Sequence, residues 1–127
     1  MKKSAQKRCL VVDDSRVIRK VARQTLEQLD FSIEEAEDGA QALEACIKTM
    51  PDVVLLDWNM PVMDGLDFLK KLRQEPEGSE PIVIFCTARC EVEDIQIALT
   101  EGADEYLMKP FDGDLLQDKL RQAGAIH

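Results

Sequence analysis

Short strand-like stretches alternate with helical patterns five times along the chain, and this alternation is the feature that most limits its fold. The strand-like stretches are residues 8–12, 32–36, 52–56, 81–85 and 104–108. Each is followed by apolar residues at the three- and four-residue intervals of an amphipathic helix. Strands that alternate with helices over short connections form right-handed crossovers and a parallel sheet with helices on both faces. The sequence therefore predicts a doubly wound α/β fold.

Cap and turn residues indicate where the helices begin and end. Asp38 and Gln41 have the spacing of an N-cap and its capping-box partner before the second helix. Asp112 or Asp114 can begin the fifth helix in the same way. Gly102 follows the fourth helix, where the left-handed conformation that glycine tolerates ends a helix.

The length and the apolar pattern indicate one domain. Residues 52–56 and 81–85 suit the centre of a sheet that is buried on both faces, whereas the polar second and fifth strands suit its edges. A chain of 127 residues fits a single domain. We therefore expect residues 1–127 to form one domain, in which only residues 1–7 are loosely ordered.

Composition and charge exclude several classes of protein. No apolar stretch approaches the roughly 18 residues of a membrane span, and the N-terminal segment has no apolar stretch of signal-peptide length, so we expect a cytoplasmic protein without a membrane partner. The net charge is −9, although eight of the 16 basic residues lie within the first 24 residues. So acidic a remainder argues against binding to nucleic acid. The cysteines form no C-x-x-C pair and are expected to be reduced, apolar side chains: Cys9, Cys46, Cys86 and Cys90.

Polar side chains follow four of the five predicted strands. They are Asp13 and Asp14 after the first strand, Asp57 after the third, Thr87 after the fourth and Lys109 after the fifth. Because the carboxyl ends of parallel strands share one edge of a sheet, these side chains should converge on one crevice. Three carboxylates at close range repel one another, and a cation or raised pKa values must relieve the repulsion. Oxygen ligands without imidazole or thiolate favour Mg²⁺.

This set of groups suits a phosphoryl group. The phosphoryl oxygens carry the negative charge that Mg²⁺ and Lys109 would neutralise, while Thr87 would donate a hydrogen bond. Asp57 is then the nucleophile that forms an aspartyl phosphate. No P-loop or G-x-G-x-x-G pattern occurs, so the donor should be a protein or a small molecule with a labile phosphoryl bond rather than ATP. Each polar residue alone could be only a helix cap or a turn former.

At these residues the sequence closely resembles the receiver domains of two-component response regulators, in particular single-domain regulators similar to CheY. The segments that carry the resemblance are VVDDS, DWNMPVMDG, CTA and EYLMKPF, and it extends over about residues 8–122. It implies a flavodoxin-like fold with five helices and a five-stranded parallel sheet of order 2-1-3-4-5. It also implies that the chain is not an enzyme beyond promoting its own phosphorylation and dephosphorylation.

The resemblance implies a role for each matching residue. Asp57 would accept the phosphoryl group from a phosphohistidine, and Thr87 and Lys109 would contact the phosphoryl oxygens. The implied Mg²⁺ ligands are the side chains of Asp13, Asp14 and Asp57, with Asp13 acting mainly through water, and the backbone carbonyl of Asn59. Thr87 and Tyr106 would form a switch. The peptide bond between Lys109 and Pro110 is expected to be cis.

The resemblance also implies partners. A histidine kinase or a histidine phosphotransfer protein would be the donor, and the fourth helix, fifth strand and fifth helix would bind a downstream protein that the sequence does not identify. Glu91, Glu93 and Asp94 stand where the chemotaxis regulator has lysines, so its target is not carried over. We expect a monomer, with a dimer on activation left open. The first helix should present a solvated basic face that steers an acidic donor, formed by Arg16, Arg19, Lys20 and Arg23.

Several alternatives remain open at this point. The chain could be a phosphate sink or a phosphorelay intermediate without its own target, or a scaffold with a vestigial site. A phosphatase of the haloacid dehalogenase type also uses an aspartate nucleophile with Mg²⁺, but its acid lies two positions on, where this chain has Asn59. An FMN-binding module would need a glycine- and hydroxyl-rich phosphate loop in place of DDS.

Two neighbours of the predicted site carry expectations of their own. Trp58 is expected to be a partly exposed aromatic side chain in a loop. Arg89 lies two positions beyond Thr87, where its guanidinium group could attract an anionic donor or obstruct the attacking water. The alternative for Arg89 is a solvated side chain at the start of a helix.

Overall fold

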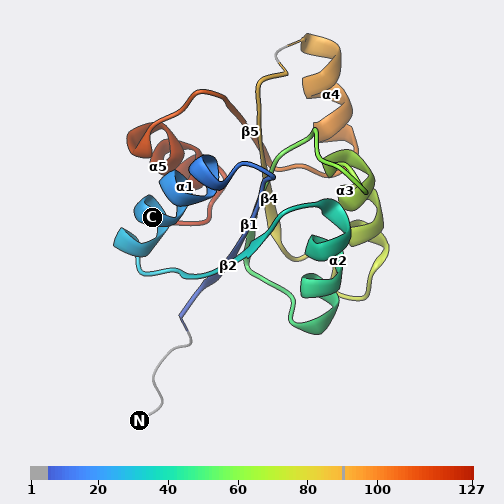
Figure 1. Ribbon diagram of the computed structural model, residues 1–127, viewed down its shortest axis with the longest axis horizontal. Coiled ribbons are helices and arrows are strands. Elements are labelled where there is room, and N and C mark those ends of the chain that lie inside the picture. Colours follow the sequence, from blue (N-terminus) through green and yellow to red (C-terminus); the bar gives the residue numbers. More distant parts are fainter. Residues whose placement is uncertain (1–5, 90) are drawn as a thin grey trace.

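The computed structural model describes residues 6–89 and 91–127, and its elements follow the alternating order that the sequence predicts (Figure 1). The strands are β1 (Arg8–Val12), β2 (Ser32–Ala36), β3 (Val53–Leu56), β4 (Ile82–Thr87) and β5 (Glu105–Met108). The helices are α1 (Arg16–Gln28), α2 (Gly39–Lys48), α3 (Gly65–Gln74), α4 (Val92–Thr100) and α5 (Gly113–Gln122). All strands pair in parallel in the order β2-β1-β3-β4-β5. The flavodoxin-like strand order is confirmed.

The sheet separates two apolar layers, because successive side chains of a strand point to opposite faces. Helices α1 and α5 cover one face, and α2, α3 and α4 cover the other (Figure 1). Leu55 packs with Leu26 and Leu116 in the first layer, while its neighbour Leu56 packs with Phe68 in the second. Burial on both faces explains why β3 is apolar without interruption.

Side chains cap the starts of four helices. Ser15, Asp38, Asp64 and Asp112 each accept a hydrogen bond from the backbone N–H of the third residue after them. Gln41 bonds to the N–H of Glu37 rather than to that of Asp38, so the capping box differs from the predicted one by one residue. Among the described residues, none caps α4 through its side chain. Gly102 follows α4 with a φ of 116°, as expected for a helix stop.

The segment before β1 is anchored where the structure describes it. Gln6 donates to the carbonyl of Asp30, and Lys7 donates to the carbonyl of Ala125. Residues 1–5, the rest of the segment predicted to be loose, lie outside the described residues. Among the described residues, three cysteines are free and buried, as predicted: Cys9, Cys46 and Cys86. Cys90 lies outside the described residues.

No helix in the two described ranges, 6–89 and 91–127, has the length and apolar character needed to cross a membrane.

Gly65, the first residue of α3, permits a close approach between this helix and the end of β3. A β-carbon at Gly65 would overlap the backbone carbonyl of Asp57 and would lie 3.1 Å from the ring of Phe85. Backbone atoms at the end of a central strand cannot rotate away as a flexible side chain does. The position of Asp57 therefore depends on glycine at residue 65.

We expect Gly65→Ala to lower the free energy of unfolding by about 3 kcal/mol, the upper part of the usual range for overpacking. Urea unfolding followed by the fluorescence of Trp58 measures this change. Gly124→Ala is the matched control, because its β-carbon would meet no described atom within 4 Å. Its positive φ of 85° should alone cost about 1 kcal/mol. Equal losses for the two variants would contradict the role of the close approach.

Candidate functional site

The register of the sheet places the ends of β1 and β3 at the same level. Val12 pairs with Leu56, and Leu56 pairs in turn with Phe85 on β4. The residues that follow the first two, Asp13 and Asp57, therefore lie next to each other. The backbone N–H of Asp57 continues the ladder by donating to the carbonyl of Val12 at 2.9 Å.

Three carboxylates gather at this edge of the sheet. One carboxylate oxygen from each of Asp13, Asp14 and Asp57 lies within 4.8 Å of those of the other two. Asp13 and Asp57 are buried, whereas Asp14 is exposed. These ligand atoms are all oxygen, which fits a hard divalent cation that keeps several of its waters. The exposed Asp14 gives such a hydrated ion an open side.

Lys109 provides the positive charge within this cluster. Its Nζ lies 2.7 Å from Oδ2 of Asp13 and 3.5 Å from Oδ1 of Asp57. Burial raises the pKa of Asp57 to about 6, the charge of Asp13 raises it too, and Lys109 opposes both effects. Burial lowers the pKa of Lys109, but the two carboxylates outweigh it and the net shift is upward. The Lys109–Pro110 peptide bond is cis, as the resemblance implies.

The two residues expected to form a switch both bond to the backbone of Arg89. Thr87 is buried at the end of β4, and its hydroxyl oxygen accepts the backbone N–H of Arg89 at 3.3 Å. The ring of Tyr106 is also buried, and its hydroxyl group donates to the backbone carbonyl of Arg89 at 2.9 Å. Thr87 thus binds the N–H of Arg89, and Tyr106 binds its carbonyl. Movement of these side chains remains a prediction.

Trp58 is buried, with only 4% of its surface exposed, so the expectation of a partly exposed loop aromatic is wrong. The loop after β3 folds back, since the N–H of Gly65 donates to the carbonyl of Trp58, and the indole packs 5.2 Å from the ring of Phe85. The guanidinium group of Arg89 lies 4.4 Å from the centroid of the Trp58 ring. Stacking on this indole explains why Arg89 is held near the site.

Arg89 also binds Asn59, whose backbone carbonyl is a predicted metal ligand. Its Nη2 donates to the side-chain oxygen of Asn59 at 3.0 Å, and its Nη1 pairs with Asp94 of α4 at 3.4 Å. Asn59 is exposed, and the described contacts do not test the predicted role of its backbone carbonyl as a metal ligand. Arg89 therefore spans from the loop after Asp57 to the first turn of α4.

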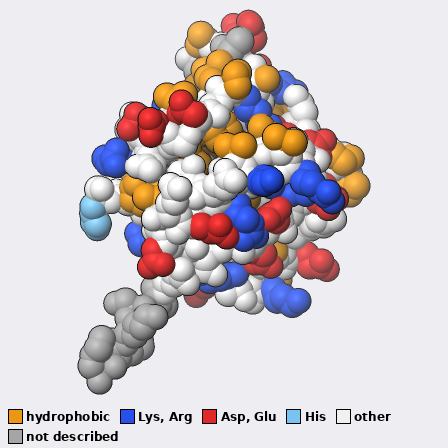
Figure 2. All heavy atoms as spheres, turned by 60° about the vertical axis from the view of Figure 1, so that its left-hand side comes forward, with side chains coloured by type: hydrophobic (Ala, Val, Ile, Leu, Met, Phe, Trp, Pro, Cys, Tyr) orange, Lys and Arg blue, Asp and Glu red, His pale blue; other side chains and the backbone are white. Residues whose placement is uncertain are grey.

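The predicted basic face of α1 is only partly solvated. Arg16 and Lys20 are exposed, but Arg19 is 8% exposed and does not belong to a solvated face. Arg23 pairs with Glu35 at 2.8 Å and with Glu27 at 3.1 Å. Acidic and basic side chains are interleaved over the side of the molecule seen in Figure 2. Of the four basic side chains predicted to steer a donor, two remain as exposed cations, Arg16 and Lys20.

Two residues that hold the acidic loop were missed by the sequence analysis. The N–H of Ser15 donates to Oδ1 of Asp13, and Nη1 of Arg19 donates to the carbonyl of Asp13. A signal for Arg19 exists in the sequence, because it shares the sheet-facing stripe of α1 with Ala22 and Leu26 at helical spacing. A charged residue on an apolar stripe indicates a buried partner.

A parallel α/β sheet with an acidic cluster and a lysine at the carboxyl ends of its strands defines a class of signalling domains. The family model described as response regulator receiver domain matches residues 9–121. The chain therefore belongs to this family, and it is the receiver domain of a two-component response regulator.

Relatives and solved structures agree with this assignment. The chain is 40% identical over 114 residues to the response regulator MprA of Mycobacterium sp. (strain KMS), a match that covers 90% of this chain and 49% of that protein. It thus spans about half the length of the curated relatives it matches. The chemotaxis response regulator CheY4 of Vibrio cholerae superposes with a TM-score of 0.88 at 33% identity, covering 94% of this chain and 99% of that one. A CheY-like receiver domain protein from Methanospirillum hungatei JF-1 gives 0.81 at 30% identity, with coverages of 95% and 96%.

The raised pKa of Asp57 makes the stability of the fold depend on pH. Its carboxyl group ionises near 3.8 when unfolded and near 6 when folded. Between these values the folded state binds more protons, so the free energy of unfolding falls as pH rises from about 4 to about 6. Asp57→Asn removes the buried charge and should raise stability at pH 7 by up to about 3 kcal/mol, in the presence of a chelator.

Urea unfolding between pH 4 and pH 7 measures this effect. The profile of Asp57→Asn should lack the fall seen in the unsubstituted protein. Asp118→Asn serves as control, because this carboxylate is exposed on α5 and its loss should leave the profile unchanged. Parallel profiles for the unsubstituted protein and Asp57→Asn would contradict the assignment of the raised pKa to Asp57.

Proposed function

We propose that this receiver domain takes a phosphoryl group from a phosphohistidine onto Asp57 with the help of Mg²⁺ and then signals by binding another protein. The observation that carries the proposal is the convergence of three carboxylates and Lys109 within one cluster. Membership of the receiver family supports it, since receiver domains generally bind Mg²⁺ at an acidic pocket. Asp13, Asp14 and Asp57, with the carbonyl of Asn59, would hold the ion.

The transfer step assigns a task to each residue. A carboxylate oxygen of Asp57 attacks phosphorus, the phosphorus–nitrogen bond of the donor breaks, and the imidazole leaves with the bonding electrons and takes a proton from solvent. Lys109 lies 3.5 Å from Asp57 and can pair with the phosphoryl oxygens. The hydroxyl of Thr87 accepts a bond from Arg89, which leaves its hydrogen to donate to the phosphoryl group. Mg²⁺ supplies neutralisation of the phosphoryl charge.

The donor in this proposal is a histidine kinase or a histidine phosphotransfer protein in the cytoplasm. The chain would promote only its own phosphorylation and dephosphorylation, and it would not turn over a separate substrate. Arg16 and Lys20, the exposed cations of α1, remain as a basic rim for an acidic donor.

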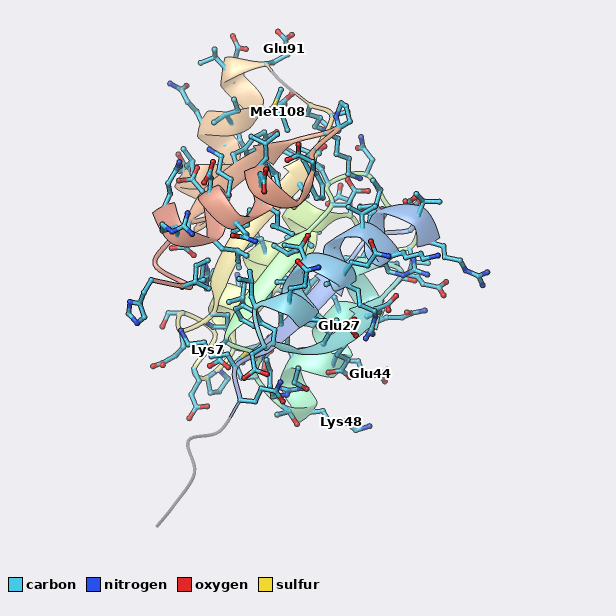
Figure 3. All side chains as sticks on the ribbon, turned by 90° about the vertical axis from the view of Figure 1, so that its left-hand side faces the viewer. Lys7, Glu27, Glu44, Lys48, Glu91 and Met108 are labelled. Carbon is cyan, nitrogen blue, oxygen red and sulfur yellow. The ribbon has the colours of Figure 1, made fainter. Side chains whose placement is uncertain are left out.

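The target in this proposal binds the face formed by α4, β5 and α5. The three elements carry five large apolar side chains that are exposed: Val92, Ile97, Leu99, Met108 and Leu115. Glu91 and Met108 lie at the same end of the molecule, opposite Lys7 (Figure 3). An apolar surface beside the acidic start of α4 suits a partner with apolar and basic side chains. A monomer would act here, and a second copy is the alternative occupant on activation. If the chain were instead a phosphate sink or a relay intermediate, it would be phosphorylated at the same site but would not bind a target through this face.

Phosphorylation with acetyl phosphate and Mg²⁺, followed by mass spectrometry of the intact chain, tests the proposed function. We expect one phosphoryl group on the unsubstituted protein and none on Asp57→Asn, because an amide is a poor nucleophile. Asp118→Asn, an exposed aspartate on α5, should be labelled normally. Label retained by Asp57→Asn would refute the assignment, and continuous release of phosphate from aryl phosphates would favour a phosphatase instead.

Arg89→Ala should accelerate loss of the phosphoryl group about threefold or more, a barrier difference of about 0.7 kcal/mol. The guanidinium group is held between Trp58 and Asn59 beside the site, where it obstructs the approach of water. The decay of phosphoprotein after removal of the donor measures the rate. Arg121→Ala removes an exposed arginine on α5 and should decay like the unsubstituted protein. A slower decay for Arg89→Ala would show that the cation assists hydrolysis.

A further inference from the structure

Arg19 connects the acidic loop to the edge strand β2 through the interior of the molecule. Its Nη1 donates to the backbone carbonyl of Asp13 at 2.6 Å, and its Nε donates to Oε1 of Glu35 at 2.7 Å. Only 8% of Arg19 is exposed. A guanidinium group buried to this degree is stable only when its donors are satisfied, so these two bonds fix its position.

The bond to Asp13 completes the restraint of that residue. Its backbone N–H donates to the carbonyl of Ala36 at 3.1 Å, on the same strand as Glu35. Its carboxylate accepts from Ser15 through Oδ1 and from Lys109 through Oδ2. Arg19 binds the remaining polar group of Asp13, its backbone carbonyl. Because the peptide bond is planar, a fixed carbonyl also fixes the plane of the peptide between Asp13 and Asp14. The direction in which Asp14 leaves the backbone therefore depends on Arg19.

We propose that Arg19 is a positioning residue for the metal site. It orients Asp13 and Asp14 toward the bound cation through the backbone of Asp13. The proposal rests on the proposed function, since it requires the acidic cluster to bind Mg²⁺. Arg19 acts through the backbone of Asp13 and does not touch the ion. Outer residues that orient metal ligands commonly change affinity by about 10- to 100-fold when they are replaced.

The contribution of Arg19 is geometric rather than a matter of its charge. Glu35 offsets the positive charge of Arg19 and is shared with Arg23. Burial raises the pKa of Glu35, but hydrogen bonds from Arg19 and Arg23 outweigh it, and the pKa lies below its usual value. The planar guanidinium fork donates to a carbonyl and a carboxylate in two fixed directions at once, which the compact ammonium of lysine does not reproduce.

Arg19→Lys tests the proposal because it keeps the charge and removes the fork. Titration with Mg²⁺, followed by the fluorescence of the single tryptophan Trp58 and by calorimetry, gives the dissociation constant. We expect Arg19→Lys to raise that constant about tenfold. Arg23→Lys is the matched control, because Arg23 binds the same Glu35 and, within the described part of the chain, makes no hydrogen bond to Asp13. The dissociation constant of Arg23→Lys for Mg²⁺ should stay within about twofold of that of the unsubstituted protein.

The outcomes separate this inference from the proposed function. Equal dissociation constants for Arg19→Lys and the unsubstituted protein would overturn the inference alone. An equal rise in Arg19→Lys and Arg23→Lys would also overturn it, since Glu35 rather than Asp13 would then carry the effect. An unsubstituted protein that binds no Mg²⁺ would overturn the proposed function. Urea unfolding checks that Arg19→Lys is folded. If it is not, Glu35→Gln is the second variant, because it loosens the same guanidinium group and should weaken Mg²⁺ binding about threefold. An unchanged affinity of Glu35→Gln for Mg²⁺ would refute the inference.

Discussion

The buried charge of Asp57 is the constraint on which the rest of the site depends. A carboxylate at this depth, beside a second one, is costly to ionise. Two groups from different strands offset this cost: the N–H of Trp58, after β3, donates to Asp57 at 2.8 Å, and Lys109 approaches from β5. The site is therefore a product of the parallel sheet, since only its carboxyl edge brings these groups to one place.

The same edge connects the site with α4. Arg89 contacts Trp58 and Asn59 on one side and Asp94 of α4 on the other, while Tyr106 binds its carbonyl. The other four helices begin with a side-chain cap, whereas α4 has none among the described residues. A helix start without a cap is the one whose first turn rearranges at the lowest cost. The loop that carries Arg89 thus joins the acidic cluster to the least restrained of the five helix starts.

Patterns along the chain predicted the fold class and placed Asp13 and Asp57 at the ends of strands. The strand order that makes β1 and β3 neighbours came from the resemblance to receiver domains, and the register of these two strands brings the carboxylates together. Contacts that depend on how a loop folds back were not accessible in the same way. Trp58 is buried by the return of its loop to Gly65, and Arg19 is satisfied by Glu35 of β2, which lies 16 residues further along the chain. Propensity and spacing carry no information about such partners.

The side chain of Lys7, near the first described residue, donates to the backbone carbonyl of Ala125, near the last residue of the chain. Lys7 lies at the end of the molecule opposite Glu91 and Met108 (Figure 3), so both ends are remote from the carboxyl edge of the sheet. Ends that meet on the far side of a domain tolerate being joined to each other or to another polypeptide. A short linker across them would give a circular permutant in which the order of the strands changes along the sequence while the crevice stays intact.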